Sequence, residues 1–324
     1  MIETWLQALP HGITLSCRAC GERGRPVLLF LHGFPEGAFV WDALLTHFAQ
    51  PENGGYRCVA PNLRGFERSS APAEVKDYRP KFLVQDILAL IDSECGPHAP
   101  LAALVAHDWG GAVAWNLANQ HPARLAKLVI LNSPHPGTFL RELQNNPAQQ
   151  AASDYMNTLI QPDAEADLSA HGFAQLLSFF TARRSQNTAV EMDVTLEAQT
   201  APVAAVEQPH WLSESAKENY RQLWRQGLTG GLNYYRASPL RPPRPGDPAA
   251  AAVQLPPEAL RMDMPTLVIW GQQDHALLPA LTQGLEDHIA DLTLVPLPQA
   301  SHWVVHEEPQ RVTQEITAFL ARLH

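Results

Sequence analysis

Three side chains in this sequence could together perform covalent catalysis: Asp108, Asp274 and His302. Asp108 stands in "AHDWG", where Ala106 and Gly110 are the small residues that a sharp turn between a buried strand and a helix requires. A carboxylate on such a turn can act as a nucleophile, and a histidine can serve as a base. The sequence therefore supplies a nucleophile, a base and a second carboxylate that can orient the base.

The chain order of these residues favours catalysis over a purely structural role. Taken alone, Asp108 could simply cap the following helix. Asp274, however, follows the apolar run "TLVIWG", and His302 follows the last such run, "LTLVPL". Nucleophile, acid and histidine in this order, each after a predicted strand, form the triad arrangement of the α/β-hydrolase fold. We therefore expect all three at the sheet edge where ligands bind in such folds.

Six short apolar runs predict a mostly parallel central sheet that is buried on both faces. These runs are residues 26–33, 56–61, 101–108, 125–132, 266–271 and 292–297. Helical patterns at 79–94 and 308–324 place apolar residues on one stripe. The alternation of strands and helices predicts an α/β fold in which helices flank the sheet.

That alternation stops between residues 138 and 255, where helical patterns follow one another without a strand signal. The segment ends in the proline-rich stretch "SPLRPPRPGDPAAAAVQLPPEAL", which predicts a stiff return loop. We therefore predict a hydrolase core made of residues 1–137 and 256–324, with a helical cap inserted at 138–255.

Composition and charge exclude several classes of partner. The 324 residues are 45% hydrophobic and 17% charged, with a formal net charge of −10, which is typical of a globular protein. This charge and the lack of a basic cluster argue against nucleic acid and anionic membranes as partners. The N-terminus has no secretory pattern and no run reaches about 18 apolar residues, so we expect a cytoplasmic protein. A lone Cys17-x-x-Cys20 and scattered histidines indicate no metal site.

The motifs "LHGFPEG", "HDWGG", "GGLNYYR", "WGQQD" and "SHW" resemble those of the epoxide hydrolases, the branch of the α/β-hydrolase superfamily with an aspartate nucleophile. The resemblance runs from about residue 25 to the C-terminus. It implies an enzyme that needs no cofactor and converts an epoxide and water to a vicinal diol. The chemistry explains the carboxylate: an epoxide carbon is saturated, so serine attack would leave an ether, whereas carboxylate attack leaves an ester that water can cleave.

The resemblance also implies a role for each catalytic residue. Asp108 would be the nucleophile, His302 the base that activates water, and Asp274 the acid that orients the imidazole. The backbone N–H groups of Phe34 and Trp109 would stabilise the oxyanion formed during ester hydrolysis.

Two cap tyrosines would donate a proton to the oxygen of the opening ring. The motif "GGLNYYR" assigns this role to Tyr235, and "SDYMN" assigns it to Tyr155, 47 residues after the nucleophile. Their phenols stay protonated at neutral pH because an unperturbed phenol has a pKa near 10. Tyr234 should pack instead. Leucine, phenylalanine and tryptophan in "LLSFF" and "QLW" of the cap suggest a small apolar epoxide as substrate, and helix residue Asp86 is expected to face solvent.

Two alternative functions share parts of this pattern. A haloalkane or haloacid dehalogenase would use the same aspartate nucleophile, with Trp109 as one donor to the halide. Its second usual donor, an asparagine, is replaced by Phe34, and a departing halide needs no phenolic acid. A non-catalytic receptor for a small ligand would have no need of a complete triad.

Overall fold

A computed structural model describes residues 1–182 and 209–322 of the chain. Its centre is an eight-stranded sheet in the order β1-β2-β4-β3-β5-β6-β7-β8. The strands are β1 (Glu3–Ala8), β2 (Thr14–Cys20), β3 (Val27–Leu31), β4 (Arg57–Pro61), β5 (Ala103–His107), β6 (Leu128–Leu131), β7 (Thr266–Gly271) and β8 (Leu292–Leu297). Strand β2 runs antiparallel to both of its neighbours, β1 and β4, and β4, β3, β5, β6, β7 and β8 are mutually parallel. The predicted mostly parallel sheet is confirmed.

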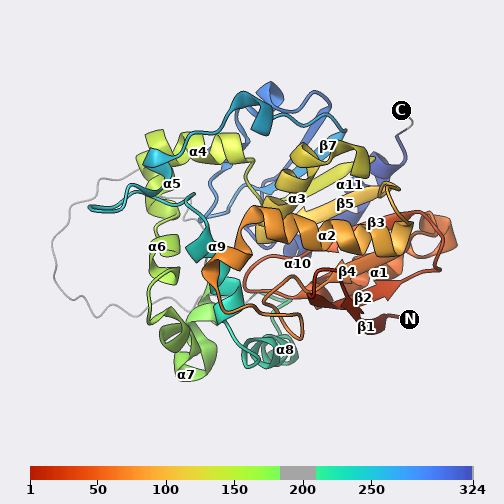
Figure 1. Ribbon diagram of the computed structural model, residues 1–324, viewed down its shortest axis with the longest axis horizontal. Coiled ribbons are helices and arrows are strands. Elements are labelled where there is room, and N and C mark those ends of the chain that lie inside the picture. Colours follow the sequence, from red (N-terminus) through yellow and green to blue (C-terminus); the bar gives the residue numbers. More distant parts are fainter. Residues whose placement is uncertain (183–208, 323–324) are drawn as a thin grey trace.

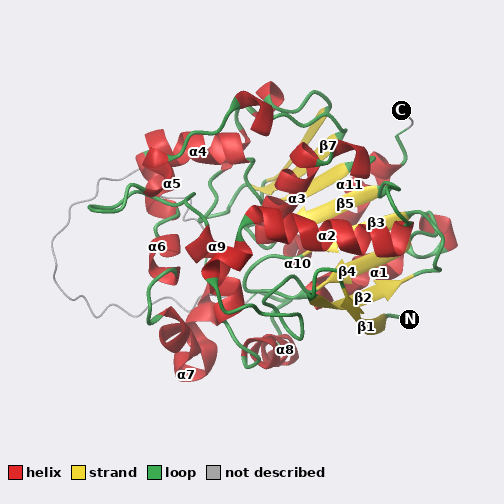
Figure 2. Cartoon of the chain, in the orientation of Figure 1, coloured by secondary structure: helices red, strands yellow, loops and turns green. Residues whose placement is uncertain are grey.

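Helices cover both faces of this sheet (Figure 1, Figure 2). One face carries α2 (Pro80–Cys95) and α3 (Asp108–Gln120); the other carries α1 (Asp42–Phe48), α10 (Val304–Glu307) and α11 (Pro309–Leu320). Successive side chains of a strand point to opposite faces. In β3, Leu29 and Leu31 accordingly join the first core, and Leu28 and Phe30 join the second. Burial on both faces explains why the strands are continuous apolar runs.

A helical region is inserted between β6 and β7, as predicted. It contains α4 (Pro136–Asn145), α5 (Pro147–Ala152), α6 (Tyr155–Leu159), α7 (Ala164–Phe179), α8 (Glu214–Trp224) and α9 (Thr229–Ala237). Within the described part of this region there is no sheet strand, and the proline-rich return has only the short 3-10 turns Ala249–Ala252 and Pro257–Ala259. Helices α5, α6 and α7 lie beyond one end of the sheet, on the left of Figure 1, and α8 lies at the bottom near the middle.

Helix α9 is fastened to the core by direct backbone contact. Gly65, in the loop after β4, has a φ of +88°, and a Cβ on Gly230 would lie 2.3 Å from the Gly65 Cα. Only glycine permits so close an approach. In the next turn of the helix, the Tyr234 hydroxyl donates to the Arg64 carbonyl oxygen at 2.9 Å. The core therefore fixes the position of α9.

The prediction that Asp86 faces solvent is wrong. This α2 residue is only 2% exposed, and it accepts hydrogen bonds from Arg64 Nε at 2.8 Å and Arg64 Nη2 at 2.7 Å. His11 Nε2 lies 2.6 Å from Asp86 Oδ1, the oxygen that also accepts Arg64 Nη2. A buried carboxylate needs such partners because desolvation of an unpaired charge is costly.

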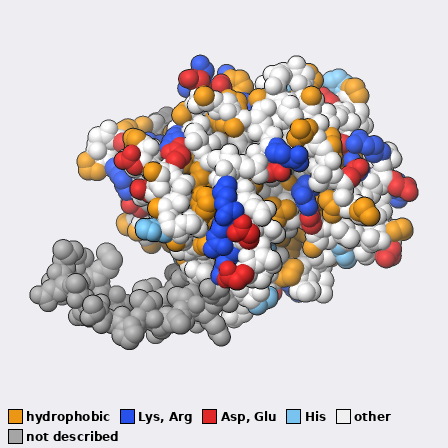
Figure 3. Space-filling view, turned by 90° about the horizontal axis from the view of Figure 1, so that it is seen from below, with side chains coloured by type: hydrophobic (Ala, Val, Ile, Leu, Met, Phe, Trp, Pro, Cys, Tyr) orange, Lys and Arg blue, Asp and Glu red, His pale blue; other side chains and the backbone are white. Residues whose placement is uncertain are grey.

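On the face drawn in Figure 3, acidic and basic side chains adjoin one another over much of the surface. None of the helices in the described ranges has the length and apolar character needed to span a bilayer. Cys17 and Cys20 lie in β2 as buried free thiols. Within residues 1–182 and 209–322, no group of three or more histidine, cysteine, aspartate or glutamate side chains is arranged to hold a metal ion.

Candidate active site

Asp108 occupies a strained turn that only small neighbours allow. It follows β5 directly, begins α3 and has a φ of 50°, a backbone region that non-glycine residues adopt at a cost. A Cβ on Gly110 would lie 2.5 Å from the Leu31 carbonyl oxygen, and a Cβ on Gly33 would lie 2.3 Å from the Asp108 Cβ. The two glycines thus let strand, helix and the neighbouring loop converge on one carboxylate.

The position of Asp108 in the sheet is the one where α/β proteins place ligands. Strand β3 lies between β4 and β5, so the chain leaves β3 in one direction and returns to add β5 on the other side. A crevice forms outside the carboxyl ends of the strands at such a switch point. Phe34 follows β3 and Asp108 follows β5, so both border this crevice.

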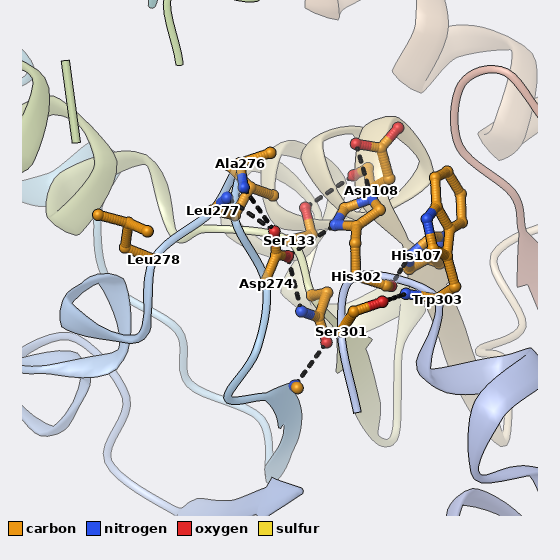
Figure 4. A network of polar contacts seen from close by, with 12 residues as sticks. His107, Asp108, Ser133, Asp274, Ala276, Leu277, Leu278, Ser301, His302 and Trp303 are labelled. Carbon is orange, nitrogen blue, oxygen red and sulfur yellow. Dashed lines mark hydrogen bonds and ion pairs between the residues drawn. The ribbon is translucent and has the colours of Figure 1, made fainter. Parts of the chain in front are cut away.

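The structure brings the three predicted triad residues together (Figure 4). His302 Nδ1 lies 2.7 Å from Asp274 Oδ2, and His302 Nε2 lies 3.6 Å from Asp108 Oδ2. All three side chains are largely buried; Asp274 has no exposed surface. The imidazole therefore lies between two carboxylates, with its Nδ1–H donated to Asp274 and its Nε2 facing Asp108.

Asp274 is held rigidly by further donors. Its Oδ1 accepts the backbone N–H groups of Ala276 and Leu277, both at 2.9 Å, and its Oδ2 accepts Asn132 Nδ2 at 2.8 Å. Asn132 in turn accepts the Gly271 N–H at 2.9 Å. Sequence reasoning missed Asn132, although its place directly after β6 is the kind of strand end that supplied the triad.

The charges in this cluster stabilise one another. Burial alone would raise the pKa of Asp108, but its interaction with His302 outweighs burial and lowers it. The pKa of Asp274 is lowered in the same way, against burial, by His302 and its hydrogen-bond donors. Burial would lower the pKa of His302, yet the charge of Asp274 and its contact with Asp108 raise it to about 10. At neutral pH the free protein thus holds an imidazolium between two carboxylates.

Both predicted oxyanion donors contact the nucleophile itself. The Phe34 N–H donates to Asp108 Oδ1 at 2.7 Å, and the Trp109 N–H also hydrogen-bonds to this carboxylate and lowers its pKa. The Ser133 hydroxyl donates to the Asp108 backbone carbonyl at 2.7 Å, which anchors the turn. Asp108 Oδ1 is therefore bound by the Phe34 N–H, and Oδ2 is the oxygen that faces His302.

The two predicted acids meet above the nucleophile. The Tyr235 ring is 3% exposed and packs edge-on against Trp109 at 5.0 Å and Phe34 at 5.4 Å between ring centroids. The Tyr155 ring lies 6.2 Å from that of Tyr235. Burial and then the Asp108 charge raise the pKa of Tyr155, and burial raises the pKa of Tyr235. Both phenols therefore stay protonated at neutral pH, whereas the hydroxyl of Tyr234 is engaged by the core.

A cavity of about 310 Å³ opens in front of these groups. Asp108, Tyr155 and Tyr235 line its inner end, and most of its wall is contributed by α3, α4 and the return loop of residues 238–259. The segments "LLSFF" and "QLW", whose apolar side chains suggested an apolar substrate, do not line this cavity. Residues 176–180 are not part of its wall, and Leu223 and Trp224 line a separate small void. These side chains instead pack the cap, whose helices need a core of their own.

A second buried charge lies behind the triad, and sequence reasoning missed it. Glu36 is 1% exposed and accepts the Tyr220 hydroxyl and His306 Nε2, both at 2.7 Å. His107 Nδ1 lies 3.5 Å away, and His107 Nε2 contacts the His302 carbonyl oxygen at 2.9 Å. Although burial raises the pKa of Glu36, the adjacent histidines lower it overall. Its position in "HGFPEG", two residues after Phe34, was the available signal.

Comparison with known proteins agrees with this geometry. A sequence model described as the alpha/beta hydrolase fold matches residues 26–309. Epoxide hydrolase 3 of Xenopus tropicalis is 31% identical over 98% of this chain and 77% of its own length. The AB hydrolase superfamily protein YfhM of Bacillus subtilis (strain 168) is 30% identical over 96% and 95% of the two chains. Among solved structures, one described as belonging to novel epoxide hydrolases from metagenomes of hot environments is 34% identical, with a TM-score of 0.80 and full coverage of both chains.

The chain therefore belongs to the α/β hydrolase fold family. Within that family it groups with the epoxide hydrolases, which recur among both its full-length relatives and its structural neighbours. Potato (Solanum tuberosum) epoxide hydrolase I, for example, superposes over both complete chains with a TM-score of 0.79 at 26% identity.

Proposed function

We propose that this protein hydrolyses epoxides to vicinal diols through a covalent ester on Asp108. The observation that carries the proposal is the arrangement around one carboxylate: a backbone N–H holds its Oδ1, a histidine lies beside its Oδ2, and two protonated phenols line the cavity that it faces. These phenols also favour an epoxide over a halogenated substrate, because a departing halide needs no proton.

In the first step, Asp108 Oδ2 attacks a ring carbon from the side opposite the C–O bond that breaks. The electron pair of that bond goes to the ring oxygen, which takes a proton from Tyr155 or Tyr235. The carboxylate needs no base to activate it, since its lowered pKa keeps it ionised at neutral pH. The product of this step is an ester between Asp108 and the substrate carbon.

Ester formation also prepares the second step. The Asp108 charge that helps to raise the pKa of His302 is consumed when the ester forms, so the imidazole can lose its proton and act as a base. His302 Nε2 then takes a proton from water, and the resulting hydroxide attacks the ester carbonyl carbon, Asp108 Cγ. Asp274 orients the imidazole and stabilises its charged form.

The tetrahedral intermediate places its negative charge on Asp108 Oδ1. The Phe34 N–H already binds this oxygen in the free protein, and the Trp109 N–H stabilises the same carboxylate, so little reorganisation is needed when the charge develops. Loss of one such donor typically costs about 3 to 4 kcal/mol of transition-state stabilisation. Collapse of the intermediate expels the alkoxide, which takes the proton of the newly formed carboxylic acid and leaves as the diol, so the Asp108 carboxylate is restored. The proton that His302 lost after the first step returns to the tyrosinate.

We further propose that the substrate is a small apolar epoxide and that residues 138–255 form the cap that selects it. The cavity wall includes apolar side chains such as Leu83, Phe139 and Leu240, and burial of apolar substrate surface there would favour binding. A variant of the Bacillus megaterium epoxide hydrolase, with 25% sequence identity and a TM-score of 0.79 to this chain, was solved with its product (R)-3-[1]naphthyloxy-propane-1,2-diol. Residues 1–137 and 256–324 form the core in this division.

A single turnover in water enriched in oxygen-18 tests the mechanism. With the protein in excess over an epoxide, the first diol should carry ordinary oxygen, and the label should enter the Asp108 side chain, where peptide mass analysis detects it. Asp108→Asn serves as the control and should neither form the diol nor gain label through turnover. Label in the first diol with none at Asp108 would instead indicate direct attack of water on the ring.

A further inference from the structure

The substrate cavity extends from the nucleophile mainly in one direction, along α3. Residues on one face of this helix, Asp108, Ala112, Asn116 and Gln120, line it in succession. The helix rises about 18 Å between the first and the last of these residues. Gln120 is exposed, and Tyr235 at the other end is buried. The cavity is therefore a channel with its mouth near Gln120 and its closed end at the tyrosines.

The opposite side of the nucleophile is blocked by an aromatic wall. The Phe34 backbone contacts the Asp108 carboxylate, and the Phe34 ring packs edge-on against Tyr235. Behind that ring lies a second void of about 10 Å³, whose apolar wall includes Phe66, Leu223 and Leu228. Phe34 lines this void and not the channel.

The wall is closely packed. A Cβ on Gly231 of α9 would lie 2.9 Å from the Phe34 Cδ2 atom, so the ring touches the helix backbone. Phe34 is only 5% exposed, and α9 is itself fixed to the core by the contact between Gly230 and Gly65. The Phe34 ring has little freedom to move aside, because close-packed interiors resist displacement.

We infer that the enzyme selects epoxides that carry one long substituent, and that the Phe34 side chain, packed against Tyr235, excludes a second substituent on the far ring carbon. The inference rests on the proposed function, because it assumes that the ring opens at Asp108. A terminal epoxide places its single chain along α3 and leaves only hydrogen atoms facing the wall. An epoxide with substituents on both carbons would have to push one of them against Tyr235, which lines the channel and has the Phe34 ring packed behind it.

Two isomeric substrates measure this selection directly. 1,2-Epoxyoctane and trans-4,5-epoxyoctane have the same composition and differ in whether one or both ring carbons carry a chain. The wild-type protein should show a higher kcat/KM for the terminal isomer. Phe34→Ala keeps the backbone donor, removes the ring and joins the second void to the channel. It should lower the ratio of the two kcat/KM values by about tenfold or more, the size expected when a pocket gains or loses room for a methylene group.

A comparison of ratios between variants cancels the intrinsic reactivities of the two isomers. Leu223→Ala is the matched control: it enlarges the second void but leaves the Phe34 ring in place, so its ratio should stay at the wild-type value. If Phe34→Ala does not fold, as judged by circular dichroism, Phe34→Leu removes the aromatic ring with a smaller loss of volume and should shift the ratio in the same direction.

An unchanged ratio in a folded Phe34 variant, an equal change in Leu223→Ala, or equal wild-type activity on both isomers would overturn the inference. Failure of the proposed function gives a different result. In that case oxygen-18 would not enter Asp108 with the terminal isomer in the wild-type protein, whatever the ratios are.

Discussion

His302 Nε2 lies 3.6 Å from Asp108 Oδ2, close enough for strong electrostatic coupling but beyond a good direct hydrogen bond. The histidine thus senses the charge of the nucleophile. While Asp108 is ionised, its contact helps to raise the pKa of His302 to about 10. In the proposed mechanism that contribution disappears when the ester forms, so His302 becomes available as a base for the second step.

Substitution His302→Gln should separate the two chemical steps. The carboxylate can still open the ring, because its attack does not need a base, but water is no longer activated. We expect steady-state turnover to fall by about 10²- to 10⁴-fold, the usual contribution of a general base. Intact-protein mass spectrometry should then show an adduct of substrate mass that persists. A variant that is inactive and never forms the adduct would place His302 in the first step instead.

The raised pKa of His302 also predicts a pH dependence of stability. A group whose pKa is higher in the folded state stabilises the fold fully below its unfolded value, near 6.5, and this stabilisation is lost as pH rises through about 10. The free energy of unfolding should therefore fall from about pH 7 to pH 10 more steeply in the wild-type protein than in His302→Gln. Urea denaturation at several pH values measures both slopes, and equal slopes would contradict the assigned charge state.

Single substitutions should distinguish the two proposed acids, Tyr155 and Tyr235, from the neighbouring Tyr234 by their effects on kcat/KM. Tyr155→Phe and Tyr235→Phe should each lower kcat/KM by about 10- to 150-fold, because a hydrogen bond to a charged group is worth about 1.5–3 kcal/mol. Tyr234→Phe is the matched control, since its hydroxyl bonds to the Arg64 carbonyl oxygen. It should lower the thermal stability and leave kcat/KM near the wild-type value. A larger loss of kcat/KM in Tyr234→Phe than in Tyr155→Phe or Tyr235→Phe would contradict the choice of Tyr155 and Tyr235 as the acids.

The charge of the cavity wall predicts discrimination against anionic substrates. Asp108 is the only charged side chain among the described residues of the wall, so a carboxylate on the substrate chain would be desolvated without a counter-ion. We expect 10,11-epoxyundecanoate to have a KM at least about tenfold higher than its methyl ester, which follows from a cost of about 1.4 kcal/mol. Steady-state kinetics at low and high salt measure the difference. Equal KM values would show that the anion finds a cation or reaches water.

The apolar runs and short motifs of the sequence were sufficient to predict much of the fold and of the candidate site. Strands buried on both faces produce apolar runs, and parallel strands bring their carboxyl ends to one edge. Asp108, Asp274 and His302 each follow such a strand, so their convergence could be anticipated without knowing the register of the sheet. The "GGLNYYR" motif likewise located Tyr235, although only the structure distinguishes its environment from that of Tyr234.

Features that depend on distant partners could not be predicted in this way. Asp86 lies on a helix whose sequence does not reveal that Arg64 and His11 neutralise it. The cap segments 176–180 and 222–224 are apolar enough to line a cavity, but they pack within the cap and around the second void. Which apolar residues meet a substrate and which meet one another is decided by tertiary packing, because the hydrophobic effect is non-directional.

The backbone contact between Gly65 and Gly230 divides the cap into parts with different evolutionary freedom. It joins α9, which carries Tyr235, to the loop after β4. Tyr235, the proposed acid, therefore keeps its position relative to the sheet. Among the described residues, no glycine of helices α4 to α8 packs against the backbone of the core in this way. Substitutions in these helices can therefore alter the shape of the cavity without moving Tyr235 relative to Asp108, so substrate preference can change while the proposed chemistry is retained.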